Sequence, residues 1–282
     1  MYWITKSCHE PELYLRWFQM ATFLPFYRSH CSNNVEYRAP WTYGEPFLSI
    51  IRDFLNLRYH LMPYLYTLAW EASQKGYPLV RPLFWYHPHQ MNLWDIDDAF
   101  YLGEALLICP ILQAGAQSRM VTLPPGRWYS FWDDRVLEGD RQVELAAHMN
   151  QIPLLVKAGS ILPMDLEKNL VLHIYPPVAG SSEYLLYNDA GDGCGEWRID
   201  QFRIVRFEDG IELFWESQGD YPSIYEFPYE ETVIMFHGFM PTQIWIDGRE
   251  VDPQQLVDDS LKSLKLSAGS QFRQAYFKGA FL

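Results

Sequence analysis

Hydrophobic residues near the start of the chain recur at helical spacing. The preceding Glu10-Pro11-Glu12 places proline and acidic side chains where the first turn of a helix favours them. The hydrophobic residues follow at spacings of four, three and four positions, so they share one helix face. They are Leu13, Trp17, Met20 and Leu24. The pattern predicts a helix over Glu12 to Met20.

An apolar run from Ala21 to Tyr27 ends abruptly in Arg28, Ser29 and His30. It lies between two helical patterns. A buried strand with polar groups only at its carboxyl end is typical of a parallel β/α unit. In a (β/α)₈ barrel the carboxyl ends of the strands carry the functional residues. Arg28 and His30 are therefore the first candidate functional residues.

A longer helical period runs from Pro46 to Ser73. Thr42 and Glu45 before it have the spacing of a capping box. Pro63 should kink or split the helix, because proline removes a backbone donor and clashes with the preceding turn. Gly76 should end it, since glycine readily adopts the left-handed conformation of a helix C-terminus.

Beyond Pro78 the pattern changes to short apolar or alternating runs separated by Gly, Pro, Asp and Asn. Glu208-Asp209-Gly210 and Ile246-Asp247-Gly248 are hairpin signals. Strands at this spacing, with no helical period between them, predict antiparallel β-sandwiches. The polar patch from Asp165 to Asn169 is the expected boundary between two sandwiches.

Composition narrows the class of protein and its partners. A chain of 282 residues with 49% hydrophobic residues is long enough for two or three folded domains. Its net charge is −13 and its sequence contains no Lys/Arg cluster, which argues against nucleic acid and against anionic membranes as partners. No apolar run approaches the roughly 18 residues of a membrane-spanning helix. The four cysteines are widely spaced and form no CxxC pair, so we expect reduced thiols in a cytoplasmic protein.

Two short patterns could suggest a metal site. His87 and His89 would share one face of a strand but lack a third ligand, so a structural or exposed role is favoured. The stretch Asn188 to Gly193 has the oxygen ligands and glycines of a calcium loop. Ile199 stands where an EF-hand requires its bidentate glutamate, so a turn between strands is favoured. We expect neither a metal nor a cofactor.

Several motifs occur in one order over roughly the first two thirds of the chain. They are Glu12-Leu-Tyr-Leu-Arg-Trp-Phe-Gln19, Phe23-Leu-Pro-Phe-Tyr-Arg-Ser-His30, Leu57-Arg-Tyr-His-Leu-Met-Pro-Tyr-Leu-Tyr-Thr-Leu68, Asp98-Ala-Phe-Tyr-Leu-Gly103, Ile152-Pro-Leu-Leu-Val-Lys-Ala-Gly-Ser-Ile-Leu-Pro163 and Leu186-Tyr-Asn-Asp-Ala-Gly191. Each motif is weak alone, but the ordered set is specific. It resembles glycoside hydrolase family 31, the α-glucosidases and α-xylosidases.

The resemblance implies a mixed fold. It consists of the C-terminal end of a (β/α)₈ barrel (helix-strand-helix), followed by two antiparallel β-sandwich domains. The expected domains are residues 1–78 for the barrel end, 79–166 for the proximal sandwich and 167–282 for the distal sandwich.

The resemblance also implies a chemistry. Family members are retaining glycosidases, in which an aspartate attacks the anomeric carbon and a second carboxylic acid protonates the leaving oxygen. These carboxylates lie in motifs resembling WxDMNE and GDN, and neither motif occurs here. We therefore expect no catalytic residue in this chain. His30 carries over as a substrate-binding residue that hydrogen-bonds sugar hydroxyls, and Arg28 as one that orients neighbouring carboxylates.

The expected function is that of a C-terminal fragment of a retaining α-glycosidase acting on O-glycosyl bonds of α-glucosides or α-xylosides. A carbohydrate is the expected partner, and the fragment alone should be inactive. The alternative, favoured by the missing carboxylates, is a non-catalytic carbohydrate-binding or scaffold β-sandwich module. The sequence leaves open glucose against xylose, and the oligomeric state.

Overall fold

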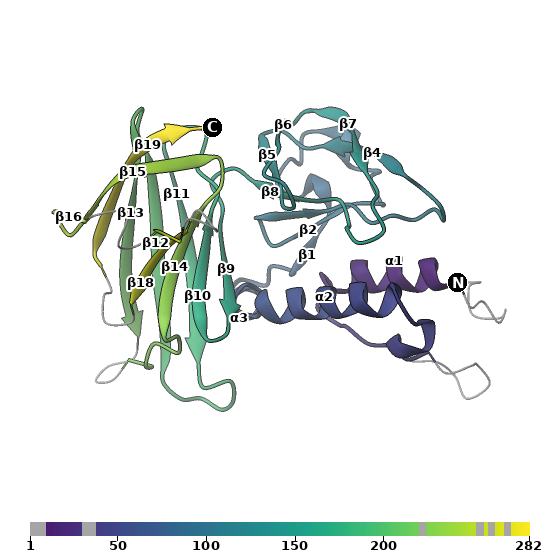
Figure 1. Ribbon diagram of the computed structural model, residues 1–282, viewed down its shortest axis with the longest axis horizontal. Helices are drawn as coiled ribbons and strands as arrows, with labels where there is room; N and C mark the ends of the chain where they lie inside the picture. Colours follow the sequence, from purple (N-terminus) through teal and green to yellow (C-terminus); the bar gives the residue numbers. More distant parts are fainter. Residues whose placement is uncertain (1–9, 30–37, 220–223, 252–256, 259–262, 268–271) are drawn as a thin grey trace.

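The computed structural model describes residues 10–29, 38–219, 224–251, 257–258, 263–267 and 272–282. Three α-helices come first, and the strands that follow form four sheets within these residues. Figure 1 shows the helices lying along one β unit, with a larger β unit standing at the end of α3. The order of helices and sheets is the one that the sequence predicts.

The first helix, α1 (Pro11–Ala21), forms as predicted, with Pro11 in its first turn. Residues 22–29 do not form the predicted strand. The amides of Phe23 and Leu24 donate to carbonyls at the end of α1, and the chain then runs irregularly. A parallel strand requires a neighbouring strand, and none of the described strands pairs with this segment. Phe23 is fully buried and serves packing, whereas Phe26 is exposed.

The long helical pattern is divided into α2 (Phe47–His60) and α3 (Met62–Lys75), so the break expected from Pro63 is confirmed. Gly76 adopts the left-handed conformation and ends α3. The capping box predicted from Thr42 and Glu45 does not form. Residues Pro40–Tyr43 form a short 3₁₀ helix, η1, and the Glu45 carboxylate accepts a hydrogen bond from the Ser49 amide at 3.1 Å. Pro46 disfavours a helical conformation at Glu45, which delays the start of α2.

The proximal β unit contains a six-stranded sheet and a two-stranded sheet. The large sheet has the order β1 (Val80–Arg81), β2 (Phe100–Leu102), β3 (Leu106–Ile108), β8 (Leu154–Lys157), β5 (Arg127–Ser130) and β6 (Val136–Glu138). The small sheet pairs β4 (Ser118–Leu123) with β7 (Arg141–Ala146). Two 3₁₀ helices, η2 (Leu83–Trp85) and η3 (Met91–Leu93), connect β1 to β2.

Alternate residues of the large sheet serve two different cores. Tyr101, Leu107 and Leu155 belong to the core beneath β4 and β7. Their neighbours Leu106 and Leu154 belong to the core that includes the helices. The two-residue period of a strand explains this division. It also explains why these strands are apolar throughout, because both faces of the sheet are covered.

The distal β unit is a sandwich of two sheets. One sheet has the order β17 (Val257–Asp258), β18 (Ser263–Ser267), β14 (Glu231–Phe236), β10 (Asn169–Ile174) and β9 (Ile161–Leu166). The other has the order β11 (Ser181–Asp189), β12 (Trp197–Arg206), β13 (Gly210–Gly219), β19 (Gln274–Phe281), β15 (Phe239–Ile246) and β16 (Arg249–Val251). The two hairpins predicted around Gly210 and Gly248 are confirmed.

Two features of this sandwich depart from the sequence analysis. Strand β10 pairs in parallel with β14, although its pairing with β9 is antiparallel. The polar patch Asp165 to Asn169 forms the turn between β9 and β10 within one sheet. The change from the sheets of the proximal unit to those of the sandwich therefore comes before Ile161. The division into domains 1–78, 79–166 and 167–282 stays a prediction.

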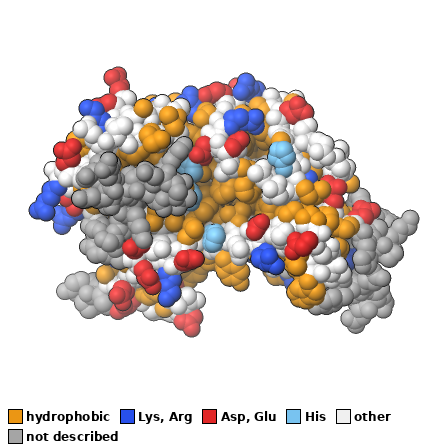
Figure 2. Space-filling model, in the orientation of Figure 1, with side chains coloured by type: hydrophobic (Ala, Val, Ile, Leu, Met, Phe, Trp, Pro, Cys, Tyr) orange, Lys and Arg blue, Asp and Glu red, His pale blue; other side chains and the backbone are white. Residues whose placement is uncertain are grey.

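The β9–β10 sheet connects the three parts of the molecule. Leu170 and Leu172 face the sandwich core, whereas Leu162 and Val171 join the core that includes α2 and α3. Figure 2 shows a band of hydrophobic side chains across the middle of the molecule. Within the described residues, no helix is long and apolar enough to cross a membrane.

Candidate functional site

The segment that leads to Arg28 is held by a single arginine of α2. The Arg58 guanidinium donates to the carbonyl oxygens of Thr22 at 2.7 Å, Leu24 at 2.8 Å and Pro25 at 3.2 Å. A planar guanidinium can bind several oxygens at once, which a lysine ammonium does less well. Arg58 therefore fixes a backbone segment that pairs with none of the described strands.

The same guanidinium also contacts an aromatic ring. Its carbon lies 5.0 Å from the centroid of the Tyr27 ring, within the range of a cation–π interaction. The other neighbour of Tyr27 is Phe18 of α1, with ring centroids 5.0 Å apart. Burial raises the pKa of Tyr27, so its phenol is neutral at physiological pH. These contacts set the direction in which the chain leaves toward Arg28.

A second set of contacts closes the site from α1. The Tyr14 hydroxyl donates to the Arg38 carbonyl at 2.9 Å and lies 3.3 Å from the Ser29 hydroxyl. Ser29 also donates to the Arg38 carbonyl, at 3.1 Å. The Tyr14 ring stacks on Tyr43 of η1 with centroids 4.4 Å apart. Burial raises the pKa of Tyr14, which keeps it a hydrogen-bond donor.

These residues surround a hollow of about 240 Å³. Its lining residues come from α1 and from both sides of the undescribed stretch 30–37. They are Tyr14, Trp17, Phe18, Ala21, Tyr27, Arg28, Ser29 and Arg38. Arg28 is exposed and lines the hollow, as a candidate functional residue should. His30 lies outside the described residues, so its role stays a prediction, as does that of Arg28.

The chemistry of the hollow suits binding better than bond cleavage. Its described lining offers two guanidinium groups, hydroxyl groups and aromatic faces, but no carboxylate. Hydroxyl and guanidinium groups bind sugar hydroxyls, and aromatic rings cover apolar sugar faces. Acid–base or nucleophilic catalysis of glycoside cleavage requires two carboxyl groups. The hollow can therefore orient a substrate whose reacting carboxylates come from elsewhere.

The two patterns considered for metal binding lie at turns between elements. His87 and His89 lie in a turn after η2, and His89 is exposed. The stretch Asn188 to Gly193 runs from the last two residues of β11 into the connection to β12, where a turn was predicted. Within it the Asp189 carboxylate accepts hydrogen bonds from Tyr66 at 2.6 Å and from the Gly191 amide at 2.8 Å. Among the described residues, no group of three metal-ligating side chains comes together.

Sequence reasoning missed the residues that build the hollow. Arg58 and Tyr14 lie inside two of the quoted motifs, but nothing in the spacing shows that they meet the segment after α1. A further motif residue, Arg16, donates to the carbonyls of Ala147 at 2.9 Å and His148 at 2.8 Å, while Gln19 donates to Met149 at 2.8 Å. This pair ties α1 to the loop between β7 and β8. Such partners are remote in sequence, so periodicity could not find them.

Comparison with known proteins agrees with this architecture. Residues 5–68 match the model described as "Glycosyl hydrolases family 31 TIM-barrel domain". Residues 76–162 match that described as "Glycosyl hydrolase family 31 C-terminal domain". The junction between the two matches falls at the end of α3, where helices give way to strands.

Curated relatives carry the same family relationship. The chain is 31% identical to alpha-glucosidase 2 of Bacillus thermoamyloliquefaciens over 262 residues, which cover 87% of this chain and 33% of that protein. It is 34% identical to an alpha-xylosidase of Saccharolobus solfataricus over 191 residues, covering 64% of this chain and 25% of that protein. The chain thus spans about a third or less of the length of these relatives.

Solved structures show the same fold. A dextranase of Flavobacterium johnsoniae complexed with glucose superposes on 98% of this chain. The match covers 38% of the dextranase chain, with a TM-score of 0.87 and 24% identity. An alpha-xylosidase of Xanthomonas citri matches 95% of this chain and 29% of its own, with a TM-score of 0.73 and 25% identity. The helices, the sheets and both family matches lead to one conclusion: the chain belongs to glycoside hydrolase family 31, and it carries the end of the (β/α)₈ barrel and the C-terminal β domains.

Proposed function

We propose that this chain is the C-terminal part of a retaining α-glycosidase that hydrolyses α-glucosides or α-xylosides. The observation that carries the proposal is the hollow at Arg28, which collects sugar-binding groups at the end of a family 31 barrel. The named relatives include both alpha-glucosidases and an alpha-xylosidase, which supports either sugar.

In this proposal the chain binds and orients the sugar, while carboxylates outside it break the bond. Arg28 and His30 contact or position the sugar, and Arg58 holds the segment that carries them. The nucleophile and the acid/base are the two carboxyl groups that double displacement requires. Since the described lining of the hollow has no carboxylate, the 282-residue chain alone should not turn over substrate.

We also propose a cytoplasmic location, because the four cysteines are widely spaced in the sequence and form no CxxC pair.

The test compares two proteins with p-nitrophenyl α-glucoside and α-xyloside as substrates. One is the 282-residue chain, and the other is this chain extended by the sequence encoded upstream of Met1. We expect turnover only in the extended protein, with a large loss of kcat/KM in its Arg28→Ala and His30→Ala variants. Turnover by the chain alone that disappears in His30→Ala would overturn the proposed division of labour. An upstream frame without both carboxylate motifs would overturn the enzyme itself and favour the non-catalytic binding module.

A further inference from the structure

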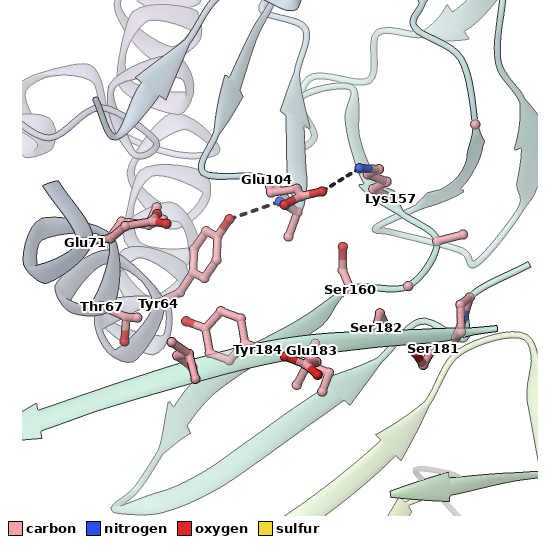
Figure 3. Close-up of a pocket in the computed structure, with 18 of the residues that line it drawn as sticks. Tyr64, Thr67, Glu71, Glu104, Lys157, Ser160, Ser181, Ser182, Glu183 and Tyr184 are labelled. Atoms are coloured by element: carbon pink, nitrogen blue, oxygen red, sulfur yellow. Dashed lines mark hydrogen bonds and ion pairs between the residues drawn. The ribbon is translucent and has the colours of Figure 1, made fainter. Parts of the chain in front are cut away.

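A larger cleft lies apart from the hollow at Arg28, with which it shares no lining residue. Its volume is about 620 Å³, within the range of small-molecule sites. Figure 3 shows its walls, which come from α3, from the turns at the ends of β2 and β8, and from the start of β11. The cleft thus opens where the helices and the two β units meet, a common position for ligand sites.

Two buried hydroxyl groups in the cleft, both on β11, are poorly matched. The Ser182 Oγ makes no hydrogen bond within the protein. The Tyr184 hydroxyl lies beside the Thr67 hydroxyl, which already donates to the Pro63 carbonyl at 2.9 Å and accepts from the Tyr187 amide at 3.1 Å. Buried polar groups without a full partner cost stability, and few occur in native structures. By contrast, the neighbouring Tyr64 hydroxyl donates to the Leu102 carbonyl at 2.7 Å and accepts from the Ala105 amide at 3.2 Å. The unmatched hydroxyls therefore point to a ligand that can donate to them or accept from them.

The basic side chains around the cleft are already paired with carboxylates. Lys157 pairs with Glu104 at 2.6 Å, Arg81 with Glu71 at 2.9 Å and Arg127 with Glu138 at 2.8 Å. Lys75 also pairs with Glu71, at 3.3 Å. Each basic residue that lines the cleft thus has a carboxylate partner. An anionic ligand would have to break these pairs, so the cleft favours a neutral ligand.

Aromatic faces complete the match. The Tyr64 and Tyr184 rings, which Figure 3 shows next to each other, have centroids 6.2 Å apart at an interplanar angle of 28° and together form one wall of the cleft. Trp70 of α3 also lines the cleft. A ligand that combines hydroxyl groups with apolar faces and carries no charge is a neutral sugar. We propose that this cleft binds one or more neutral sugar units of a glycan, as a second site that performs no chemistry.

The experiment titrates the 282-residue chain with maltotriose and isomaltotriose. Calorimetry measures the affinity, and two-dimensional NMR of the indole N–H groups locates the sugar. Trp70 reports on the cleft and Trp17 on the hollow at Arg28. We expect the Trp70 resonance to shift saturably. Tyr184→Phe and Ser182→Ala should each weaken this binding about three- to tenfold, the loss of one hydrogen bond.

Two variants serve as controls. Tyr66→Phe removes a hydroxyl of α3 that points to Asp189 and does not line the cleft, so the affinity should stay unchanged. Arg28→Ala should leave the Trp70 titration unchanged as well. An unshifted Trp70 resonance, or equal affinity in wild type, Tyr184→Phe and Ser182→Ala, would overturn the proposal. Tighter binding of inorganic phosphate than of either sugar would also overturn it. None of these readouts involves hydrolysis, so the result is independent of the proposed enzymatic function.

Discussion

The Nδ1 atom of His173 lies 2.9 Å from the Nε2 atom of His237. The Nδ1 atom of His237 in turn lies 2.6 Å from the Asp134 carboxylate. Because the carboxylate accepts, His237 carries its proton on Nδ1, and its Nε2 can then accept from His173. Tyr175 stacks on His237 with centroids 4.0 Å apart. This chain of three side chains joins the β5–β6 turn of the proximal unit to the distal sandwich.

This row of side chains, His173, His237 and Asp134, predicts a pH dependence of stability. Burial, together with the neighbouring His237, lowers the pKa of His173 to about 3. An unfolded histidine takes up a proton near pH 6.5, so the unfolded state binds more protons between pH 6.5 and 3. Stability therefore falls as the pH falls through this window. Between pH 7.5 and 5.5, His173 should remove roughly 1 kcal/mol of the free energy of unfolding.

Urea denaturation at both pH values tests this effect. The His173→Gln variant should lose this difference in stability, whereas His89→Gln, at an exposed turn, should keep it. A pH dependence that is the same in wild type and His173→Gln would show that His173 is not the group responsible.

Arg58→Lys should loosen the segment that carries Arg28. The ammonium cannot reproduce three carbonyl contacts, and hydrogen bonds to a charged group each contribute about 1.5–3 kcal/mol. Hydrogen exchange at the amides of Phe23 and Leu24 should accelerate at least tenfold. Arg52→Lys, an exposed arginine of the same helix, is the control. Equal exchange in both variants would contradict the anchoring role.

Arg16→Met should detach α1 from the proximal unit. Arg16 is only 5% exposed, and its loss leaves the carbonyls of Ala147 and His148 without their donor. We expect a destabilisation of about 3 kcal/mol, measured by urea denaturation. The exposed Arg135 provides a control as Arg135→Met, which should change stability by less than about 0.5 kcal/mol.

Asp200 is the centre of a buried polar cluster in the distal sandwich. Its carboxylate accepts from Arg198 at 2.7 Å, from the Trp215 indole at 2.8 Å and from Ser217 at 2.5 Å. Asp200→Asn leaves Arg198 buried without its counter-charge, which should cost about 3–5 kcal/mol. The double variant Asp200→Leu/Arg198→Met should be more stable than Asp200→Asn, because it buries no unpaired charge. A double variant that is less stable would contradict this explanation.

Local signals account for what the sequence predicts correctly. Pro63, Gly76 and the two Asp-Gly turns act through their own backbone conformations, so the helix break, the helix end and the hairpins follow without any tertiary information. The strand predicted for the apolar run from Ala21 to Tyr27 failed for the opposite reason. An apolar run becomes a strand only beside another strand, and no described strand lies beside it. Neither the carbonyl partners of Arg58 nor the cleft at Tyr184 has a local signal, because each joins segments far apart in the sequence.

The parallel pairing of β10 with β14 has a consequence for synthesis on the ribosome. The β9–β10 hairpin emerges early, yet β14, which pairs with the other edge of β10, follows only after β11, β12 and β13. Until then one edge of β10 has unpaired backbone groups, and such edges promote intermolecular association. The nascent chain therefore passes through a stage in which a chaperone that shields β10 would raise the yield of correctly folded protein.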